Sequence, residues 1–392
     1  MRVRAAGFHR YVIVVILFAV MLIWWGAATT TTNAGMVFAD WPLSQGSLNP
    51  PGWLHIPPFM WEHGHRLIAT AVGLLTAGMF AWCFISSWKR ALEFVLLLAG
   101  LGAIVGFLGR GAGIRRMGED GHVFWFWAAA IVGTGALVWL IVFLLRKNLS
   151  MVTKLSGLAL MVVSLQAVLG GLRVTEISDT FAVMHGCLAQ GFFCLLILIA
   201  MMSSRRWTAY TKETLGERQL HGLRTRTLGL LVAVFGQLIL GATMRHTHRL
   251  GLADDGILTT GGVLFPGFGD FDLGILFSHK VWALVVLAVS TAVSVFATRR
   301  LGDHPSLRRH SYWIVGLVVV QLGLGALVIA SGKGFWITNF HVLTGLTILA
   351  LTFALAVRSF AATKRSVRGE RGRARVGGEV VERVETVEVG VV

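Results

Sequence analysis

Four histidines are the residues whose type and spacing point most directly to chemistry. Each lies near the start of a long apolar segment, and they are His65, His185, His279 and His341. A neutral imidazole is a good ligand for haem iron, and two histidines on facing helices can hold the metal from both sides without interrupting backbone hydrogen bonds. A single histidine within a membrane is more often satisfied by a hydrogen bond, but four at repeated positions favour a bound cofactor. We expect His65 to pair with His185, and His279 with His341.

One carboxylate stands beside this set. Glu62 precedes His65 by three residues, so the two side chains share a helical face if the helix has begun by Glu62. There a carboxylate could act as an acid or base or stabilise a developing cation; the alternative is an N-terminal charge favoured by the helix dipole. The corresponding position before His279 is Leu276. This asymmetry predicts one catalytic half and one half that carries electrons.

Composition indicates which elements position these residues. The 392-residue chain is 55% hydrophobic and only 14% charged, unlike a soluble domain. Its apolar runs are long enough to cross about 30 Å of hydrocarbon as helices. We predict an all-α, polytopic transmembrane helical bundle of ten spans. The spans are residues 11–28, 65–88, 91–109, 123–145, 155–172, 181–202, 227–244, 273–298, 312–330 and 338–358.

The net charge of +16 could suggest a nucleic-acid partner, but the placement of the charges argues against one. If the N-terminus is inside, 26 of the 35 Lys and Arg residues fall in segments on the cytoplasmic side. This is the positive-inside pattern of membrane proteins. We therefore expect the lipid bilayer and no nucleic acid as a partner, both termini in the cytoplasm, and the histidines toward the outer face.

An internal repeat organises the chain. Three predicted spans end in similar stretches that start with glutamine and contain glycine, at residues 166–171, 237–241 and 321–325. His65-Arg66 and His279-Lys280 open helices that run in the same direction. The chain therefore reads as two pseudo-symmetric four-helix units.

The repeat predicts the domain organisation. Residues 91–145 have no counterpart in the second half and are expected to form an inserted helical hairpin. The tail has too few large apolar residues to bury a core and is expected to be disordered. The predicted parts are an N-terminal transmembrane unit (1–202, with the hairpin), a cytoplasmic linker (203–226), a C-terminal transmembrane unit (227–360) and a cytoplasmic tail (361–392).

Together these residues resemble the haem A synthase family, integral membrane enzymes that oxidise the C8 methyl group of haem O to the formyl group of haem A. The individual pieces are short, but they extend over most of the chain. The matching pieces are residues 39–42, 62–67, 166–171, 237–241 and 321–325, with His185, His279 and His341.

The resemblance implies a haem b bound by His279 and His341 in the C-terminal unit. It also implies that His65 and His185 frame the site for the substrate, haem O. Glu62 would be the essential carboxylate. Successive hydroxylations would give a geminal diol, loss of water would give the aldehyde, and electrons would pass between the two haem sites.

The resemblance further implies a bacterial inner membrane and a haem O synthase as a partner. The electron donor, a quinol or a ferredoxin-like protein, is not identified by the sequence, and a homo-oligomer is left open. Many bacterial members carry a cysteine pair in the first external loop. Here Cys83, Cys187 and Cys194 all lie in predicted spans, so no disulfide is expected. The usual eight spans also become ten.

Two other functions fit the same histidines. One is a di-haem b protein that passes electrons without chemistry on a haem, against which the presence of Glu62 in only one half argues. The other is a haem-handling factor for cytochrome oxidase assembly, which would need no redox-active second haem.

Overall fold

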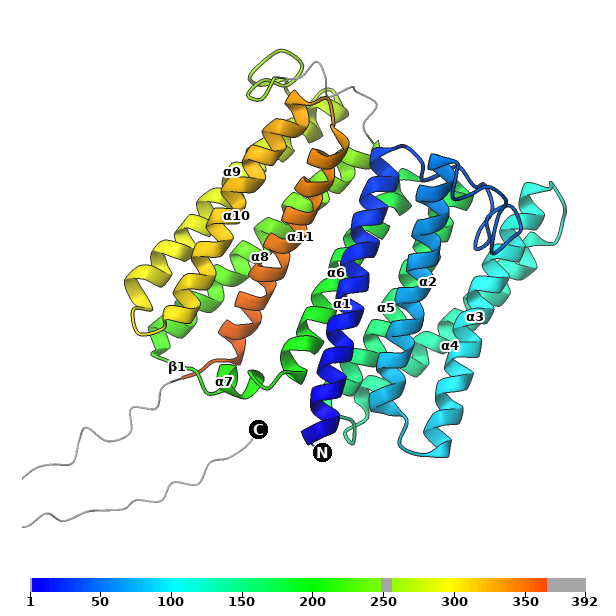
Figure 1. The fold of residues 1–392 in the computed structure, drawn as a ribbon, viewed down its shortest axis with the longest axis horizontal. Helices are drawn as coiled ribbons and strands as arrows, with labels where there is room; N and C mark the ends of the chain where they lie inside the picture. Colours follow the sequence, from blue (N-terminus) through cyan, green and yellow to red (C-terminus); the bar gives the residue numbers. More distant parts are fainter. Residues whose placement is uncertain (1, 248–255, 365–392) are drawn as a thin grey trace, which may run out of the picture.

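The computed structural model describes residues 2–247 and 256–364 and is almost entirely helical (Figure 1). Within these ranges ten helices are long and apolar enough to cross a membrane, which confirms the predicted all-α polytopic fold. The elements are α1 (Arg2–Thr31), α2 (Pro57–Phe84), α3 (Trp88–Arg116), α4 (His122–Leu145), α5 (Met151–Glu176), α6 (Asp179–Ser203), α7 (Trp207–Thr211), β1 (Thr214–Leu215), α8 (Glu217–Thr247), α9 (Phe271–Arg300), α10 (Pro305–Ala330), α11 (Phe335–Ala361) and β2 (Thr363–Lys364).

Several helices extend beyond the apolar runs that predict them. Helix α2 begins at Pro57, where a proline loses nothing because the first N–H groups of a helix have no partner within it. Glu62 and His65 therefore both lie inside the helix. Helix α8 begins at Glu217, within the range expected for the linker, with this carboxylate in its first turn. Hydropathy marks only the part of a helix that lies in hydrocarbon, so it misses polar first turns.

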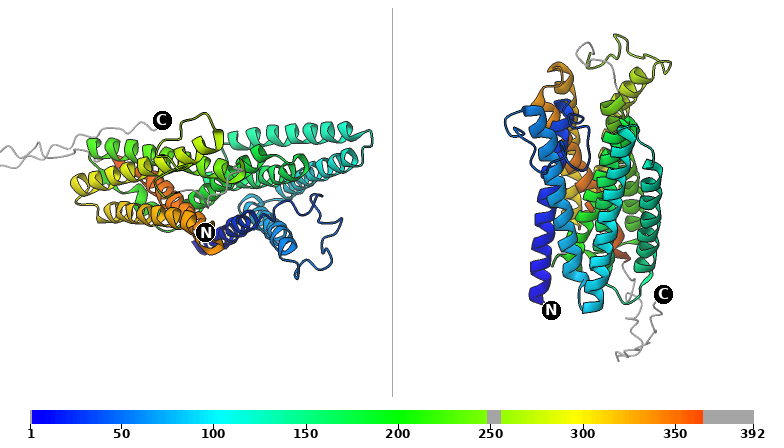
Figure 2. Two further views of the ribbon diagram at one scale, coloured as in Figure 1. Left: turned by 90° about the horizontal axis from the view of Figure 1, so that it is seen from above. Right: turned by 90° about the vertical axis from the view of Figure 1, so that its right-hand side faces the viewer.

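The eight helices of the repeat form two rings that are packed in the same order. In the first ring α1 contacts α2, α2 contacts α5, α5 contacts α6, and α6 returns to α1. In the second ring α8, α9, α10 and α11 follow the same circuit. The rings meet through α6 against α8 and through α11 against α1 and α6, and they lie side by side (Figure 2). Each ring has its own apolar core.

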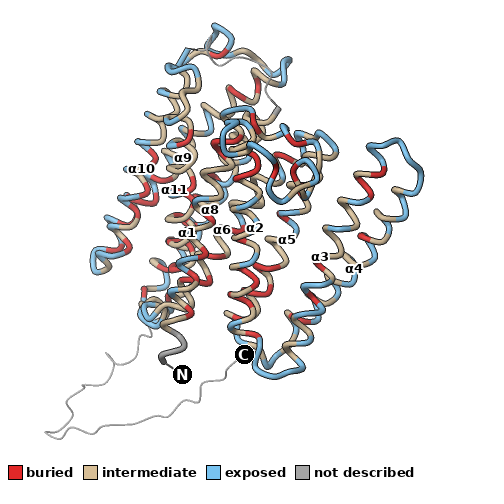
Figure 3. The backbone as a smooth tube through the Cα atoms, turned by 45° about the vertical axis from the view of Figure 1, so that its right-hand side comes forward, coloured by how far each residue is buried: buried red, intermediate tan, exposed pale blue. Residues whose placement is uncertain are grey.

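Helices α3 and α4 form a hairpin at the edge of the first ring. They pack mainly against each other and contact the ring through α5 and the start of α3 beside α2. Few of their residues are buried, as in α10, whereas the other seven ring helices bury a larger share of their residues (Figure 3). Their main attachment is an aromatic cluster in which Phe143 of α4 packs against Phe80 and Phe84 of α2. The hairpin is thus an addition to the ring and not a part of it.

The end of the bundle at which the chain begins is closed by the segment that joins the two rings. Strands β1 and β2 pair in parallel. Arg224 of α8 donates hydrogen bonds to the carbonyls of Ser359 (3.1 Å) and Ala362 (3.0 Å). Glu213 accepts one from Arg358 of α11 (3.3 Å). Residues 361–364, the start of the predicted tail, contain the end of α11 and strand β2, and residues 365–392, to which most of that prediction applies, lie outside the described residues.

We expect Gly171→Ala in α5 to lower the free energy of unfolding by about 1–3 kcal/mol, the usual cost of overpacking. A Cβ at this position would lie 2.5 Å from the ring of Trp41, a residue of the loop before α2. Gly73 of α2 faces open space, so Gly73→Ala should leave stability unchanged or raise it by about 0.5–1 kcal/mol. Denaturant unfolding of both variants in detergent, followed by circular dichroism, checks this. Equal midpoints would contradict the role given to Gly171.

Candidate functional site

Each of the four histidines packs against a glycine on the helix that precedes it. The pairs are Gly26–His65, Gly170–His185, Gly241–His279 and Gly325–His341, and they join α1 to α2, α5 to α6, α8 to α9 and α10 to α11. A Cβ added at these glycines would lie 2.9 to 3.3 Å from the Cε1 atom of the histidine. Any larger residue would have to push the ring away. The repeat therefore fixes four imidazoles by the same contact, all toward the end of the bundle opposite the N-terminus.

Glutamines add a second restraint to two of these contacts. Gln166 donates from Nε2 to the backbone carbonyl of His185 (2.7 Å), and Gln237 does the same to His279 (3.0 Å). The Nδ1 atom of His185 lies 3.1 Å from the carbonyl oxygen of Gln166. A carbonyl only accepts, so Nδ1 carries the hydrogen and Nε2 of His185 keeps its lone pair. Such a hydrogen bond to a backbone carbonyl is what orients a metal-binding histidine in many proteins.

The first helix pair departs from this pattern. Leu22 stands four residues before Gly26, where the other three helices have glutamine. Among the described residues, Nδ1 of His65 is buried without a hydrogen-bond partner. His65 is thus held by the glycine contact and by packing, with less restraint from hydrogen bonds than His185.

The structure brings His65 and His185 together across the first ring. Their ring centres are 6.4 Å apart and the ring planes are inclined at 70°. Metal–nitrogen bonds of about 2.0–2.1 Å put two imidazoles that share one metal at roughly this separation. Two histidines provide only two ligands, which suits a metal that brings its remaining ligands in a macrocycle. The residues present therefore fit a haem-type group. In the second ring, His279 and His341 lie within range of electrostatic interaction.

Two partly buried arginines lie near the two histidine pairs. Arg173, at the end of α5, is close enough to interact electrostatically with both His65 and His185. Arg245, at the end of α8, interacts in this way with His341 and also with Arg173. Two partly buried cations that repel each other are costly unless an anion lies nearby. The zone between the histidine pairs is therefore suited to carboxylate groups.

Arg245 also joins the two rings. It donates hydrogen bonds to the carbonyl of Ala27 (2.5 Å) and to Oγ1 of Thr31 (2.7 Å), both in the last turns of α1. Lys333, in the loop between α10 and α11, adds to the positive charge. Burial and, next, the Arg245 guanidinium lower the pKa of Lys333. The two arginines lie far apart in the sequence, and helical periodicity does not predict that they converge.

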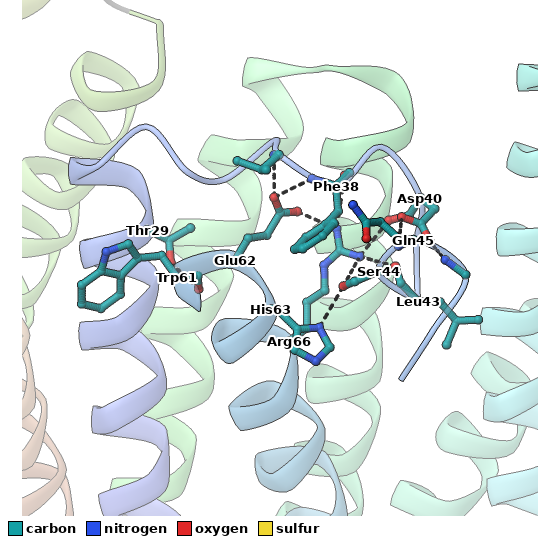
Figure 4. A network of polar contacts seen from close by, with 12 residues as sticks. Thr29, Phe38, Asp40, Leu43, Ser44, Gln45, Trp61, Glu62, His63 and Arg66 are labelled. Carbon is teal, nitrogen blue, oxygen red and sulfur yellow. Dashed lines mark hydrogen bonds and ion pairs between the residues drawn. The ribbon is translucent and has the colours of Figure 1, made fainter. Parts of the chain in front are cut away.

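The side chain of Glu62 points toward the loop between α1 and α2. Its carboxylate is buried and accepts hydrogen bonds from the backbone N–H groups of Val37 (2.6 Å) and Phe38 (2.9 Å) (Figure 4). Its other oxygen pairs with Arg66 one helical turn later, at 2.5 Å. These contacts fasten the loop over the start of α2 beside His65. The carboxylate is therefore held in place by three donors. At the corresponding position in the second ring, Leu276 is buried.

The basic residue that follows each first histidine binds a tight turn in the loop before its helix. Arg66 donates to the carbonyls of Asp40 (2.8 Å) and Leu43 and to Oγ of Ser44. Ser44 pairs with Ser47 in an antiparallel bridge, and Gln45 and Gly46 between them have positive φ. This is the two-residue hairpin turn that glycine favours.

The second ring has the same arrangement, with lysine in place of arginine. Lys280 donates to the carbonyl of Thr259 (2.7 Å) and to Oγ1 of Thr260 (3.2 Å). Thr260 pairs with Val263 across Gly261 and Gly262, both of positive φ. Arg66 and Lys280 therefore bind their loops. The dipeptides His65-Arg66 and His279-Lys280 are the visible sign of this arrangement in the sequence. The glycines of the two turns are the other part of the pattern.

Comparison with known proteins identifies relatives of the chain. A family model described as "Cytochrome oxidase assembly protein" matches residues 125–372, from α4 to beyond α11. This range includes His185, His279 and His341, while Glu62 and His65 precede it. A protein named "Heme A synthase" from Symbiobacterium thermophilum is 30% identical over 136 residues. That match covers 34% of this chain and 43% of the relative.

We expect Glu62→Gln to expose the loop that the carboxylate fastens. Hydrogen bonds to a charged group contribute about 1.5–3 kcal/mol, so amide exchange at Val37 and Phe38 should become at least roughly tenfold faster. Glu119→Gln, in the exposed loop between α3 and α4, should leave both amides unchanged. Hydrogen–deuterium exchange with mass spectrometry measures this. Unaltered exchange at Val37 and Phe38 would show that the three contacts do not hold the loop.

Proposed function

Because the chain belongs to the cytochrome oxidase assembly protein family, we propose that it is a haem A synthase, which oxidises the C8 methyl group of haem O to a formyl group. The observation that carries this proposal is the pair of histidines in each ring, every one of them set against a glycine of the neighbouring helix. Two such pairs provide two haem sites in one chain. A synthase needs one site for its substrate and one for a redox partner.

The two sites divide the work between the rings. His279 and His341 would hold a haem b, which supplies one-electron transfer when bound. His65 and His185 would frame the haem O substrate. Two successive hydroxylations of the methyl group, each consuming one dioxygen and two electrons from the donor and releasing one water, would give a geminal diol. Loss of water from the diol would give the aldehyde. The glycine contacts keep each imidazole in place, so little reorganisation is needed when a porphyrin binds.

The surrounding charges would orient the substrate. Haem O carries two carboxylates, and the partly buried guanidinium groups of Arg173 and Arg245 are suited to bind them in bidentate fashion. Since Arg245 belongs to the second ring yet bonds to α1, it would connect the two haem sites. Arg66 and Lys280 would act indirectly, through the turns that they hold over each site.

Glu62 is the feature that would distinguish the catalytic ring. Its three donors hold the carboxylate in one place, and they close the loop over the start of α2, which would exclude water from the substrate site. The second ring has Leu276 instead, as expected for a site that only transfers electrons.

The proposed setting is a bacterial inner membrane, with both termini in the cytoplasm and the haem sites toward the outer face. A haem O synthase would supply the substrate. A quinol or a ferredoxin-like protein would supply electrons. The concentration of Lys and Arg at the end of the bundle where the chain begins supports this orientation.

We expect membranes that contain this protein, together with a source of haem O, to accumulate haem A. The pigments are extracted and separated by chromatography. Haems B and O alone, alongside folded protein, would remove the synthase proposal. As a matched variant, Glu62→Gln should retain haem B but form no haem A. Full haem A formation by this variant would remove the role proposed for the carboxylate.

His341→Ala should abolish the low-spin haem b spectrum of the purified protein, because a single remaining histidine cannot ligate the iron from both faces. His310, in the same ring, donates from Nε2 to the carbonyl of Leu351 (3.0 Å) and serves as the control. His310→Ala should retain the spectrum. Reduced-minus-oxidised optical spectra, normalised to protein, make the comparison. A wild-type spectrum in His341→Ala would refute the proposed ligand pair.

A further inference from the structure

A basic groove lies on the surface of α8 and α9, at the end of the bundle where the chain begins. Its volume is about 300 Å³. It lies at the far end of α9 from His279, and so apart from the histidine sites. The residues that line it are Arg226 of α8 and Ala292, Val295, Phe296, Arg299 and Arg300 of α9.

The groove is apolar along one part and basic at its end. Ala292, Val295 and Arg299 follow at intervals of three and four residues, so they share one face of α9, and all three are exposed. Phe296 forms the floor, because a Cβ at Gly222 of α8 would lie 2.7 Å from its ring. A molecule with a hydrocarbon chain and an anionic head group would place its chain on the apolar part and its head group at the basic end.

No carboxylate partner is found among the described residues for the arginines of the groove. Arg226 lies over the ring of Phe296, with its guanidinium carbon 4.4 Å from the ring centroid, and donates to the carbonyl of Gly222 (3.1 Å). In residues 2–247 and 256–364 no carboxylate forms an ion pair with Arg226, Arg299 or Arg300. Nearby Arg358, by contrast, pairs with Glu213. The three guanidinium groups that line the groove are therefore suited to bind an anionic ligand.

We propose that this groove binds one anionic phospholipid, with its phosphate among the three arginines and an acyl chain along Ala292 and Val295. Basic pockets between transmembrane helices at the membrane surface are suited to such head groups. A free phosphate ion would use the guanidinium groups but leave the apolar wall uncovered. The bound lipid would join the start of α8 to the end of α9.

Native mass spectrometry of the full-length protein, released from nanodiscs, tests this. The nanodiscs contain phosphatidylcholine with or without phosphatidylglycerol. The groove variant combines Arg226→Gln, Arg299→Gln and Arg300→Gln. The matched control combines Lys89→Gln, Lys147→Gln and Lys212→Gln, which removes the same charge from exposed lysines at the same end of the bundle. Arg299→Gln alone is the milder variant if the triple variant does not fold.

We expect the wild type and the control to retain one phosphatidylglycerol, and the groove variant to bind it on the order of 10–100-fold more weakly. Arg299→Gln should weaken binding to a smaller extent. Retention in the groove variants equal to the wild type would overturn the proposal. Loss of the bound lipid on addition of millimolar inorganic phosphate would also overturn it, because the site would then be one for free phosphate. Equal retention of phosphatidylcholine would overturn it as well.

Discussion

The close contact between a histidine ring and a glycine on the preceding helix is the constraint on which the rest of the structure depends. It occurs four times, at Cβ-equivalent distances of 2.9 to 3.3 Å, and it joins α1 to α2, α5 to α6, α8 to α9 and α10 to α11. Small residues allow such approach in membranes, where no hydrophobic driving force pulls helices together. The contact therefore serves packing and site geometry at once, and a larger residue would disturb both.

The charges around the sites follow from this geometry. Because the histidines lie toward one end of their helices, Arg173 and Arg245 reach the zone between the pairs from the ends of α5 and α8. Burying cations there is costly and is compensated only in part by bonds such as that from Arg245 to Ala27. An anionic ligand between the rings would stabilise both arginines. The two rings thus depend on each other through a charged contact as well as an apolar interface.

The transmembrane helices and the histidine pairs could be predicted from the sequence, because they depend on local sequence patterns. Hydropathy alone predicts the ten spans, and repeated spacing predicts the histidine pairs, since both depend on helical periodicity. The partners of Glu62 could not be predicted, because Val37 and Phe38 reach it only through the folding of a long loop. The same holds for Lys280, whose loop turn depends on glycines with positive φ far from it in sequence. Contacts made by loops depend on tertiary structure, so they cannot be predicted from the sequence patterns of helices.

The central claim is that each ring holds one porphyrin between its two histidines. An electron cryomicroscopy map of the purified, pigmented protein tests it most directly. The account predicts planar density with a central metal between His65 and His185, in a sample supplied with haem O, and a second such density between His279 and His341. Metal density ligated by other residues, or two imidazoles hydrogen-bonded to each other with no room between them, would contradict the account.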